Sequence, residues 1–164
     1  MKKPNIVLLI TDQHRYDCVG FSAQYPVQTP NIDRLAAESV WFDQAYSTIP
    51  TCCPARQSLL SGKRPERFGA HWNYDITLKI PDLPVNEFSF ARALKAQGYR
   101  TAYIGKWHVS QQYSPLDYGF DTYYSVGQAH AHLHEKGYKS SWETAKESHN
   151  HCICNIFANS VYRV

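Results

Sequence analysis

Apolar and polar residues alternate along the chain in blocks that predict strands and helices in turn. Residues 5–10, Asn-Ile-Val-Leu-Leu-Ile, form an almost continuous apolar run, which is typical of a parallel strand covered on both faces. Residues 29–36 open with Thr-Pro-Asn and then carry apolar side chains at helical spacing, which predicts a helix. The triplet Val-Trp-Phe at residues 40–42 is strand-like.

A proline indicates where the next helix begins. It lies in residues 51–62, Thr-Cys-Cys-Pro-Ala-Arg-Gln-Ser-Leu-Leu-Ser-Gly. Proline favours the first helical position and pushes the residue before it toward extended geometry. We therefore expect the helix to start at Pro54, with Cys52 and Cys53 on the incoming loop, and to end at Gly62. The Cys52 side chain then lies beside a helix N-terminus, where free amide groups favour an anion.

A loop, a helix and a strand continue the alternation. Residues 68–84 are polar and interrupted by prolines, which indicates a loop. Asn86 is expected to cap a helix that runs to Gln97 and is terminated by Gly98. Residues 101–104, Thr-Ala-Tyr-Ile, predict a second buried strand. Strands and helices in alternation favour an α/β sandwich.

Composition and charge fit one globular domain and argue against nucleic-acid binding. The chain has 164 residues, of which 43% are hydrophobic and 19% charged, and these values are those of a globular protein. Its net charge of +3 is small and the basic residues form no stripe, so no nucleic-acid partner is expected. Five cysteines, an odd number without a secretory signal, argue against a disulfide framework.

The apolar run near the N-terminus is too short for a targeting or membrane segment. Lys2 and Lys3 precede five apolar residues, and Thr11 then ends the run. A signal peptide needs a longer apolar stretch and a small-residue cleavage site. A membrane span needs about 20 apolar residues. We therefore expect a cytoplasmic protein without membrane association.

Polar and charged residues that follow the predicted strands indicate a site for a tetrahedral anion. Asp12 and Gln13 come directly after the first strand, at the carboxyl end where open α/β sheets bind ligands. Lys106 and His108 follow the second strand, and their side chains point to one side if the segment stays extended. Arg56, in the first turn of the expected helix, presents a planar set of donors suited to an oxyanion.

Ordinary structural roles are the alternative for each of these residues. The two adjacent cysteines then pack as small apolar groups, and Arg56 is a surface residue. Lys106 is then an exposed lysine, and His108 a hydrogen-bonded histidine beside a packed Trp107.

Several motifs, taken in order and spacing, resemble the sulfatase family. The central one is Cys-x-Pro-x-Arg at residues 52–56, which leads into Leu-Ser-Gly-Lys. The others are Leu-Ile-Thr-Asp-Gln at residues 9–13, Thr-Pro-Asn-Ile-Asp-Arg-Leu-Ala at residues 29–36, Arg-Pro-Glu-Arg-Phe-Gly at residues 64–69, Gly-Lys-Trp-His at residues 105–108 and Pro-Leu-Asp-Tyr-Gly-Phe-Asp at residues 115–121. The resemblance extends from residue 5 to about residue 127.

The resemblance implies an α/β, alkaline-phosphatase-like fold, in which helices sandwich a mostly parallel sheet that is truncated here. Residues 1–127 are then the amino-terminal portion of a sulfatase catalytic domain, and residues 128–164 are a tail without clear family resemblance. The family's later metal ligands, and a further lysine and histidine, lie in a carboxyl-terminal segment that has no match here.

The resemblance also assigns chemical roles. Cys52 is oxidised to formylglycine by a formylglycine-generating enzyme, and one oxygen of the hydrated aldehyde attacks the sulfur of a small-molecule or carbohydrate sulfate ester. Lys106 contacts the sulfate, His108 contacts the formylglycine hydroxyl, and Arg56 completes the catalytic set.

A hard divalent cation, Ca²⁺ or else Mg²⁺ or Mn²⁺, is the implied cofactor. Its ligands are Asp12, the modified Cys52 and Gln13, which stands where many sulfatases have a second aspartate. The histidines at residues 130–134 and the His and Cys residues at 149–154 suit zinc by type, but their spacing favours surface residues.

The resemblance leaves three functions open. The first is a sulfuric ester hydrolase of the arylsulfatase type, of which this chain is an incomplete part. The second is a phosphonate monoester or phosphodiester hydrolase of the same superfamily. The third is a truncated product without catalysis.

Overall fold

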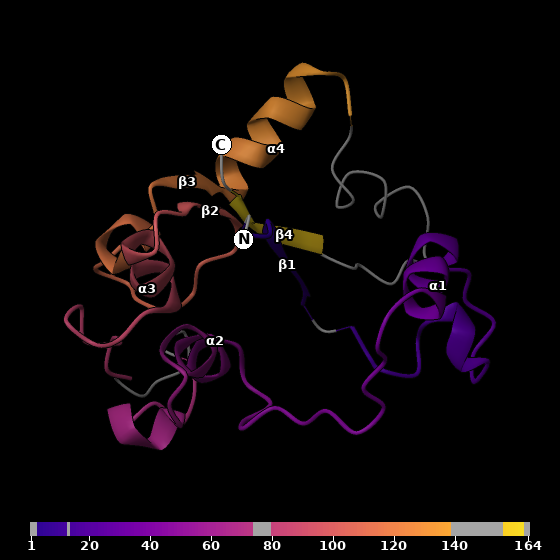
Figure 1. Cartoon of the computed structure of the whole chain (residues 1–164), viewed down its shortest axis with the longest axis horizontal. Coiled ribbons are helices and arrows are strands. Elements are labelled where there is room, and N and C mark those ends of the chain that lie inside the picture. The colour runs from indigo at the N-terminus through magenta and orange to yellow at the C-terminus, as the bar shows by residue number, and fades with distance from the viewer. Residues whose placement is uncertain (1–2, 13, 74–79, 139–155, 163–164) are drawn as a thin grey trace.

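A four-stranded mixed sheet forms the centre of the protein (Figure 1). The computed structural model describes residues 3–12, 14–73, 80–138 and 156–162. The strands are β1 (Ile6–Thr11), β2 (Arg100–Gly105), β3 (Thr122–Ser125) and β4 (Ile156–Tyr162), and they lie in the order β1-β4-β2-β3.

Strand directions confirm the predicted α/β fold. β2 pairs with β3 in parallel, and the pairing begins with Ala102 opposite Thr122. β4 runs antiparallel to both β1 and β2, so β1, β2 and β3 share one direction among the described strands. Because the carboxyl ends of β1 and β2 lie at one edge of the sheet, the residues that follow them, Asp12 and Lys106, are brought to the same edge.

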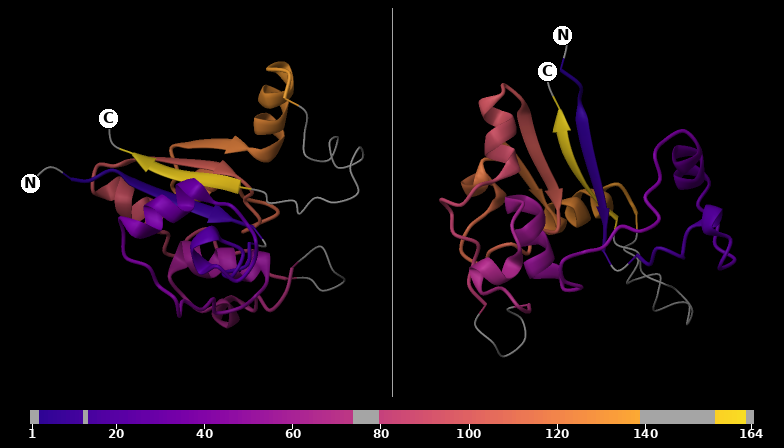
Figure 2. Two further views of the ribbon diagram at one scale, coloured as in Figure 1. Left: turned by 90° about the vertical axis from the view of Figure 1, so that its right-hand side faces the viewer. Right: turned by 60° about the horizontal axis from the view of Figure 1, so that its bottom comes forward.

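Four α-helices accompany the sheet in the described part of the chain. They are α1 (Pro30–Ala37), α2 (Cys52–Ser61), α3 (Phe90–Ala96) and α4 (Val126–Glu135). α2 and α3 lie on the same side of the sheet, whereas α1 lies apart from it (Figures 1 and 2). No helix in the described ranges is long and apolar enough to cross a membrane.

The hydrophobic core joins α2 and α3 to the end of β2. Its buried members are Leu60, Phe68, Ala70, Leu83, Ala91, Tyr103, Trp107, Val109, Tyr118 and Phe120. Tyr103 lies at its centre, with edge-to-face contacts to Trp107 at 5.1 Å and to Phe120 at 5.2 Å between ring centroids. This aromatic packing holds the carboxyl end of β2 against α2.

The predicted start of α2 at Pro54 is wrong, because the helix begins two residues earlier. Thr51 occupies the N-cap position with an extended backbone, at φ −135° and ψ 135°, and Cys52 is the first helical residue. The first four helical amides have no partner within the helix, so a proline fits anywhere in that turn. The predicted end is confirmed, since Gly62 caps the helix in the left-handed region at φ 67°.

Two further sequence predictions are wrong. Residues 40–42 form no strand, and Val40 and Phe42 are 77% and 72% exposed, because no described strand pairs with this segment. Asn86 does not cap α3. Ser89 does, since its side chain accepts a hydrogen bond from the Ala91 amide at 3.2 Å. The predicted strands at residues 5–10 and 101–104 are confirmed as β1 and β2.

Candidate active site

An open hollow of about 680 Å³ lies where β1 ends and α2 begins. Asp12 enters it from the end of β1, and Cys52 and Arg56 enter it from the first turns of α2. The segment before α2 supplies much of the remaining wall, through residues such as Ser47 and Thr51. The structure thus brings together three of the residues that the sequence singled out, although they come from distant parts of the chain.

The two adjacent cysteines occupy opposite environments. Cys52 is partly exposed, and its thiol donates to Asp12 Oδ1 at 3.7 Å. Cys53 is 0% exposed, and its sulfur accepts a hydrogen bond from Gln57 Nε2 at 3.6 Å. The backbone amide of Cys53 donates to Asn73 Oδ1 at 2.8 Å, which fixes the first turn of α2. Only Cys52 therefore presents its sulfur to the hollow.

Asp12 forms an ion pair across the edge of the sheet. Its Oδ2 lies 2.6 Å from Lys106 Nζ. Partial burial alone would raise the pKa of Asp12, whereas the hydrogen bond and charge of Lys106 lower it. The charge of Arg56 and the Cys52 thiol act in the same direction as Lys106, and together these groups outweigh burial, so the pKa of Asp12 lies below its ordinary value. Asp12 is therefore a carboxylate at neutral pH.

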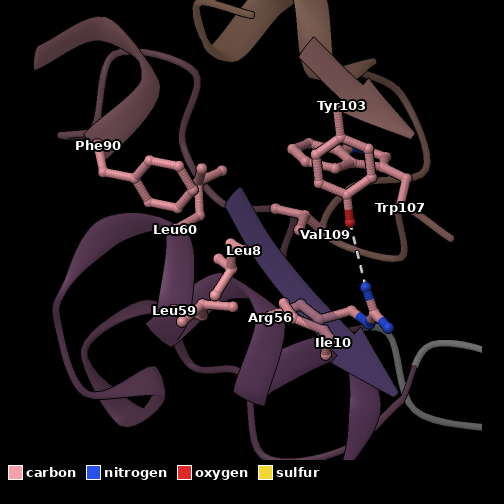
Figure 3. A pocket seen from close by; sticks show the side chains of 9 residues that line it. All are labelled: Leu8, Ile10, Arg56, Leu59, Leu60, Phe90, Tyr103, Trp107 and Val109. Carbon is pink, nitrogen blue, oxygen red and sulfur yellow. Dashed lines mark hydrogen bonds between the residues drawn. The ribbon is translucent and has the colours of Figure 1, made fainter. Parts of the chain in front are cut away.

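Arg56 is buried, so the alternative in which it is a surface residue is wrong. Its Nη1 donates to the Lys106 carbonyl at 2.7 Å and to the Tyr103 hydroxyl at 3.1 Å. Figure 3 shows the guanidinium reaching from α2 toward Tyr103, beside a small apolar cavity of about 20 Å³. Because Arg56 lines this cavity and the open hollow, its side chain forms part of the wall between them.

Lys106 and His108 lie in the loop that follows β2, and this loop is not extended throughout. Gly105 has φ 105° and His108 has φ 55°, both in the left-handed region, so the extended geometry on which their predicted common direction depended is absent. The Lys106 side chain still reaches Asp12. His108 is half-buried, and it is not among the described residues that line the hollow.

The described residues supply a metal site only in part. Asp12 offers one carboxylate, whereas Ca²⁺ prefers about six to eight oxygen ligands. No group of three or more His, Cys, Asp or Glu side chains within the described ranges is placed to hold a metal ion. Gln13 lies outside the described residues, as do residues 149–154. Asp12 therefore fits as one ligand of a hard cation whose remaining ligands come from elsewhere.

Sequence reasoning missed two residues around the hollow. His14 lines it, and its Nε2 lies 2.7 Å from the Cys18 carbonyl oxygen. Tyr103 touches both Arg56 and the Lys106 backbone. The alternation of side chains along β2 could have placed Tyr103 on one face with Gly105, but its polar contacts depend on where α2 packs.

A nucleophilic side chain at a helix N-terminus, two cations and one carboxylate define an α/β protein with a site for an oxyanion. The sequence model of the Sulfatase family matches residues 4–153. The chain belongs to the sulfatase family. The match runs past residue 127, where the sequence-based boundary of the catalytic portion was placed, so that boundary stays a prediction.

Curated relatives resemble the chain over part of their length. The chain is 41% identical over 134 residues to the ulvan-active sulfatase of Formosa agariphila, an alignment that covers 78% of this chain and 25% of the relative. It is 36% identical over 137 residues to the steryl-sulfatase of Homo sapiens, covering 76% and 24% respectively. The chain thus spans about a quarter of the length of these relatives.

A solved structure shares the fold. The crystal structure of Ps i-CgsB in complex with k-i-k-neocarrahexaose superposes with a TM-score of 0.61 at 26% identity, covering 86% of this chain and 33% of that protein. Membership in the sulfatase family implies, in general terms, a metal ion and a formylglycine, and it confirms the resemblance found in the sequence.

Proposed function

We propose that this chain is the nucleophile-bearing part of a sulfuric ester hydrolase and that Cys52 is the residue converted to formylglycine. One observation supports this most: of two adjacent cysteines, Cys52 opens into the hollow opposite Asp12, whereas Cys53 is fully buried. Cys52 is also the cysteine that stands two residues before Pro54 and four before Arg56, as the family motif requires. The partner implied is a formylglycine-generating enzyme.

The surrounding residues suit a sulfate group. Arg56 and Lys106 both place positive charge near Asp12, the hydrogen-bond partner of Cys52. The first turn of α2 adds few donors, because Pro54 has no N–H and the amides of Cys53 and Ala55 donate to Asn73 and to the Thr51 carbonyl. We assign His108, which follows Lys106 in the same loop, to the nucleophile's hydroxyl by its match to the family motif. When formed, the hydrated formylglycine supplies the oxygen that attacks sulfur. Asp12 would hold a cation such as Ca²⁺, which lowers the pKa of that hydroxyl.

The site and the relatives support a proposal for the substrate class. The hollow is open and about 680 Å³ in volume, which is room for part of a larger molecule around the sulfate group. The relative with 41% identity is an ulvan-active sulfatase, so a small-molecule or carbohydrate sulfate ester is the proposed substrate.

By itself the chain is expected to hydrolyse such esters poorly. Only one carboxylate of a divalent-cation site lies among the described residues, and Lys106 is bonded to it. A cation held by so few ligands keeps more of its water and activates the nucleophile less. This observation favours, as the second candidate, a chain that is inactive until the rest of a sulfatase site is supplied.

A chimera separates these functions. The aligned quarter of the ulvan-active sulfatase is replaced by the matching part of this chain, and the product is assayed with 4-nitrocatechol sulfate and Ca²⁺ after formylglycine is confirmed. We expect turnover that Cys52→Ala abolishes and Cys53→Ala retains. A folded, modified chimera that cleaves a phosphonate monoester and no sulfate would favour the phosphonate hydrolase class. Robust turnover by the 164-residue chain alone would contradict the expected dependence on added ligands.

A further inference from the structure

We propose that Tyr103 is a positioning residue whose hydroxyl fixes both Arg56 and Lys106 for binding one oxyanion. The proposal rests on the proposed function, because the anion in question is the sulfate group of the ester. Tyr103 lies behind the wall of the hollow and does not line it, so it acts through the two cations.

Three polar atoms form a closed triangle at the end of β2. The Tyr103 hydroxyl donates to the Lys106 carbonyl at 2.5 Å. Arg56 Nη1 donates to the same carbonyl at 2.7 Å and to the Tyr103 oxygen at 3.1 Å. Each atom of this triangle therefore contacts the other two, and a shift of one changes the geometry of both remaining contacts. We call these three contacts the Tyr103 clamp.

Packing fixes the position of the Tyr103 hydroxyl. Tyr103 is 6% exposed, and its ring is held edge-to-face by Trp107 and Phe120. Tyr123 packs against the same ring at 6.0 Å between centroids. A side chain held on several sides has little freedom to rotate, so its hydroxyl is a fixed reference point for the groups that bond to it.

The clamp acts where the backbone needs support. Gly105 and His108 flank Lys106 with positive φ, and the left-handed conformation is unfavourable for a histidine. Two hydrogen bonds to the Lys106 carbonyl hold this segment between them. This segment sets the origin of the Lys106 side chain, whose Nζ reaches Asp12, a residue that lines the hollow.

The clamp also orients the arginine. Nη1 makes two of the three contacts of the clamp, and the side chain lines the open hollow. Because the guanidinium is planar, fixing Nη1 fixes the directions of the N–H groups on its other nitrogens. Arg56 thus holds β2 with one nitrogen and has further donors for an anion in the hollow.

Tyr103→Phe removes the hydroxyl and keeps the ring, so it isolates the clamp from aromatic packing. Tyr123→Phe is the matched control, since it removes a partly buried hydroxyl from the same aromatic cluster. Burial raises the pKa of Tyr123, and its hydroxyl makes no hydrogen bond that the structure records to another described residue. A general loss of packing would affect both variants alike.

The test uses nuclear magnetic resonance on the full chain with inorganic sulfate as the probe. In the wild-type chain we expect resolved, slowly exchanging Arg56 Nη signals and a scalar coupling from Arg56 Nη1 to the Lys106 carbonyl carbon. Tyr103→Phe should average the Arg56 signals and weaken sulfate binding about fivefold, the effect of one net hydrogen bond. Tyr123→Phe should leave both unchanged.

Two results would overturn the proposal. One is a wild-type chain without the coupling, a measurement that needs no variant and stands even if Tyr103→Phe folds poorly. The other is the same Arg56 signals and sulfate affinity in both variants. A wild-type chain that shows the coupling but binds no sulfate would overturn the assignment of the clamp to anion binding, whereas the proposed function is tested separately by turnover of the chimera.

Discussion

Replacing Lys106 with methionine should destabilise the protein in a way that depends on pH. Methionine keeps most of the apolar stem and removes the ammonium group that lies 2.6 Å from Asp12 Oδ2. The carboxylate then stays partly buried with the charge of Arg56 and the Cys52 thiol as its remaining support. The pKa of Asp12 should rise, because burial favours the neutral acid.

The expected loss is about 1–2 kcal/mol at pH 7. Two unit charges about 4 Å apart attract by about 4 kcal/mol at an effective dielectric constant near 20. The Lys106 and Asp12 side chains keep 28% and 18% of their exposure, so water screens part of this attraction. Exposed pairs contribute only about 0.2–1 kcal/mol, whereas hydrogen bonds to charged groups contribute about 1.5–3 kcal/mol. The contribution of a half-buried pair to the free energy of unfolding lies between these limits.

The sign of the pH dependence follows from the lowered pKa. A carboxyl whose folded-state pKa lies below its unfolded value, about 3.9, stabilises the fold above that value. The contribution is lost as pH falls through the folded-state pKa. The difference in unfolding free energy between wild type and Lys106→Met should therefore be complete at pH 7 and shrink as the pH falls below the unfolded-state pKa of Asp12.

Urea denaturation without added divalent cation measures this difference, and a double-mutant cycle with Asp12→Asn isolates the pair. Lys95→Met is the matched control, because Lys95 pairs with Asp121 at 2.7 Å but is 54% exposed, and it should cost less than about 1 kcal/mol. An equal loss at pH 7 and pH 3, or no coupling in the cycle, would show that Lys106 acts through packing and not through its charge.

Two further outcomes are expected. Asp12→Asn should weaken Ca²⁺ binding measured by calorimetry, because it removes the carboxylate at the hollow, and unchanged affinity would mean that the cation binds elsewhere. Cys53→Ala should lower the free energy of unfolding by about 1 kcal/mol, since it removes a fully buried sulfur, whereas Cys52→Ala should change it by less than about 0.5 kcal/mol. Equal losses in urea denaturation would contradict the burial difference.

Local sequence patterns predicted the parts of the fold that depend on nearby residues. The continuous apolar runs located β1 and β2, and Gly62 marked the end of α2 because only its backbone fits the left-handed cap without strain. The start of α2 was missed by two residues because proline is tolerated throughout a first turn. Capping by Ser89 in place of Asn86 likewise could not be read from residue type, since both are good caps.

Features that depend on distant partners could not be predicted. Residues 40–42 have strand-like composition, yet a strand forms only where an edge is available for pairing. β4 lies between β1 and β2, although it comes from the segment that was expected to be a tail. The sequence motifs identified Asp12 and Lys106 as site residues. The direct contact between these two side chains depends on the packing of strands far apart in sequence.

The central claim is that Cys52, and not its neighbour, is the nucleophile precursor, and peptide mass spectrometry tests it most directly. The chain is co-expressed with a formylglycine-generating enzyme and digested, and the peptide that carries both cysteines is fragmented. We predict an aldehyde at Cys52 and an intact thiol at Cys53, because only the Cys52 sulfur opens into the hollow. An aldehyde at Cys53, or two unmodified thiols in the presence of an active modifying enzyme, would contradict the account.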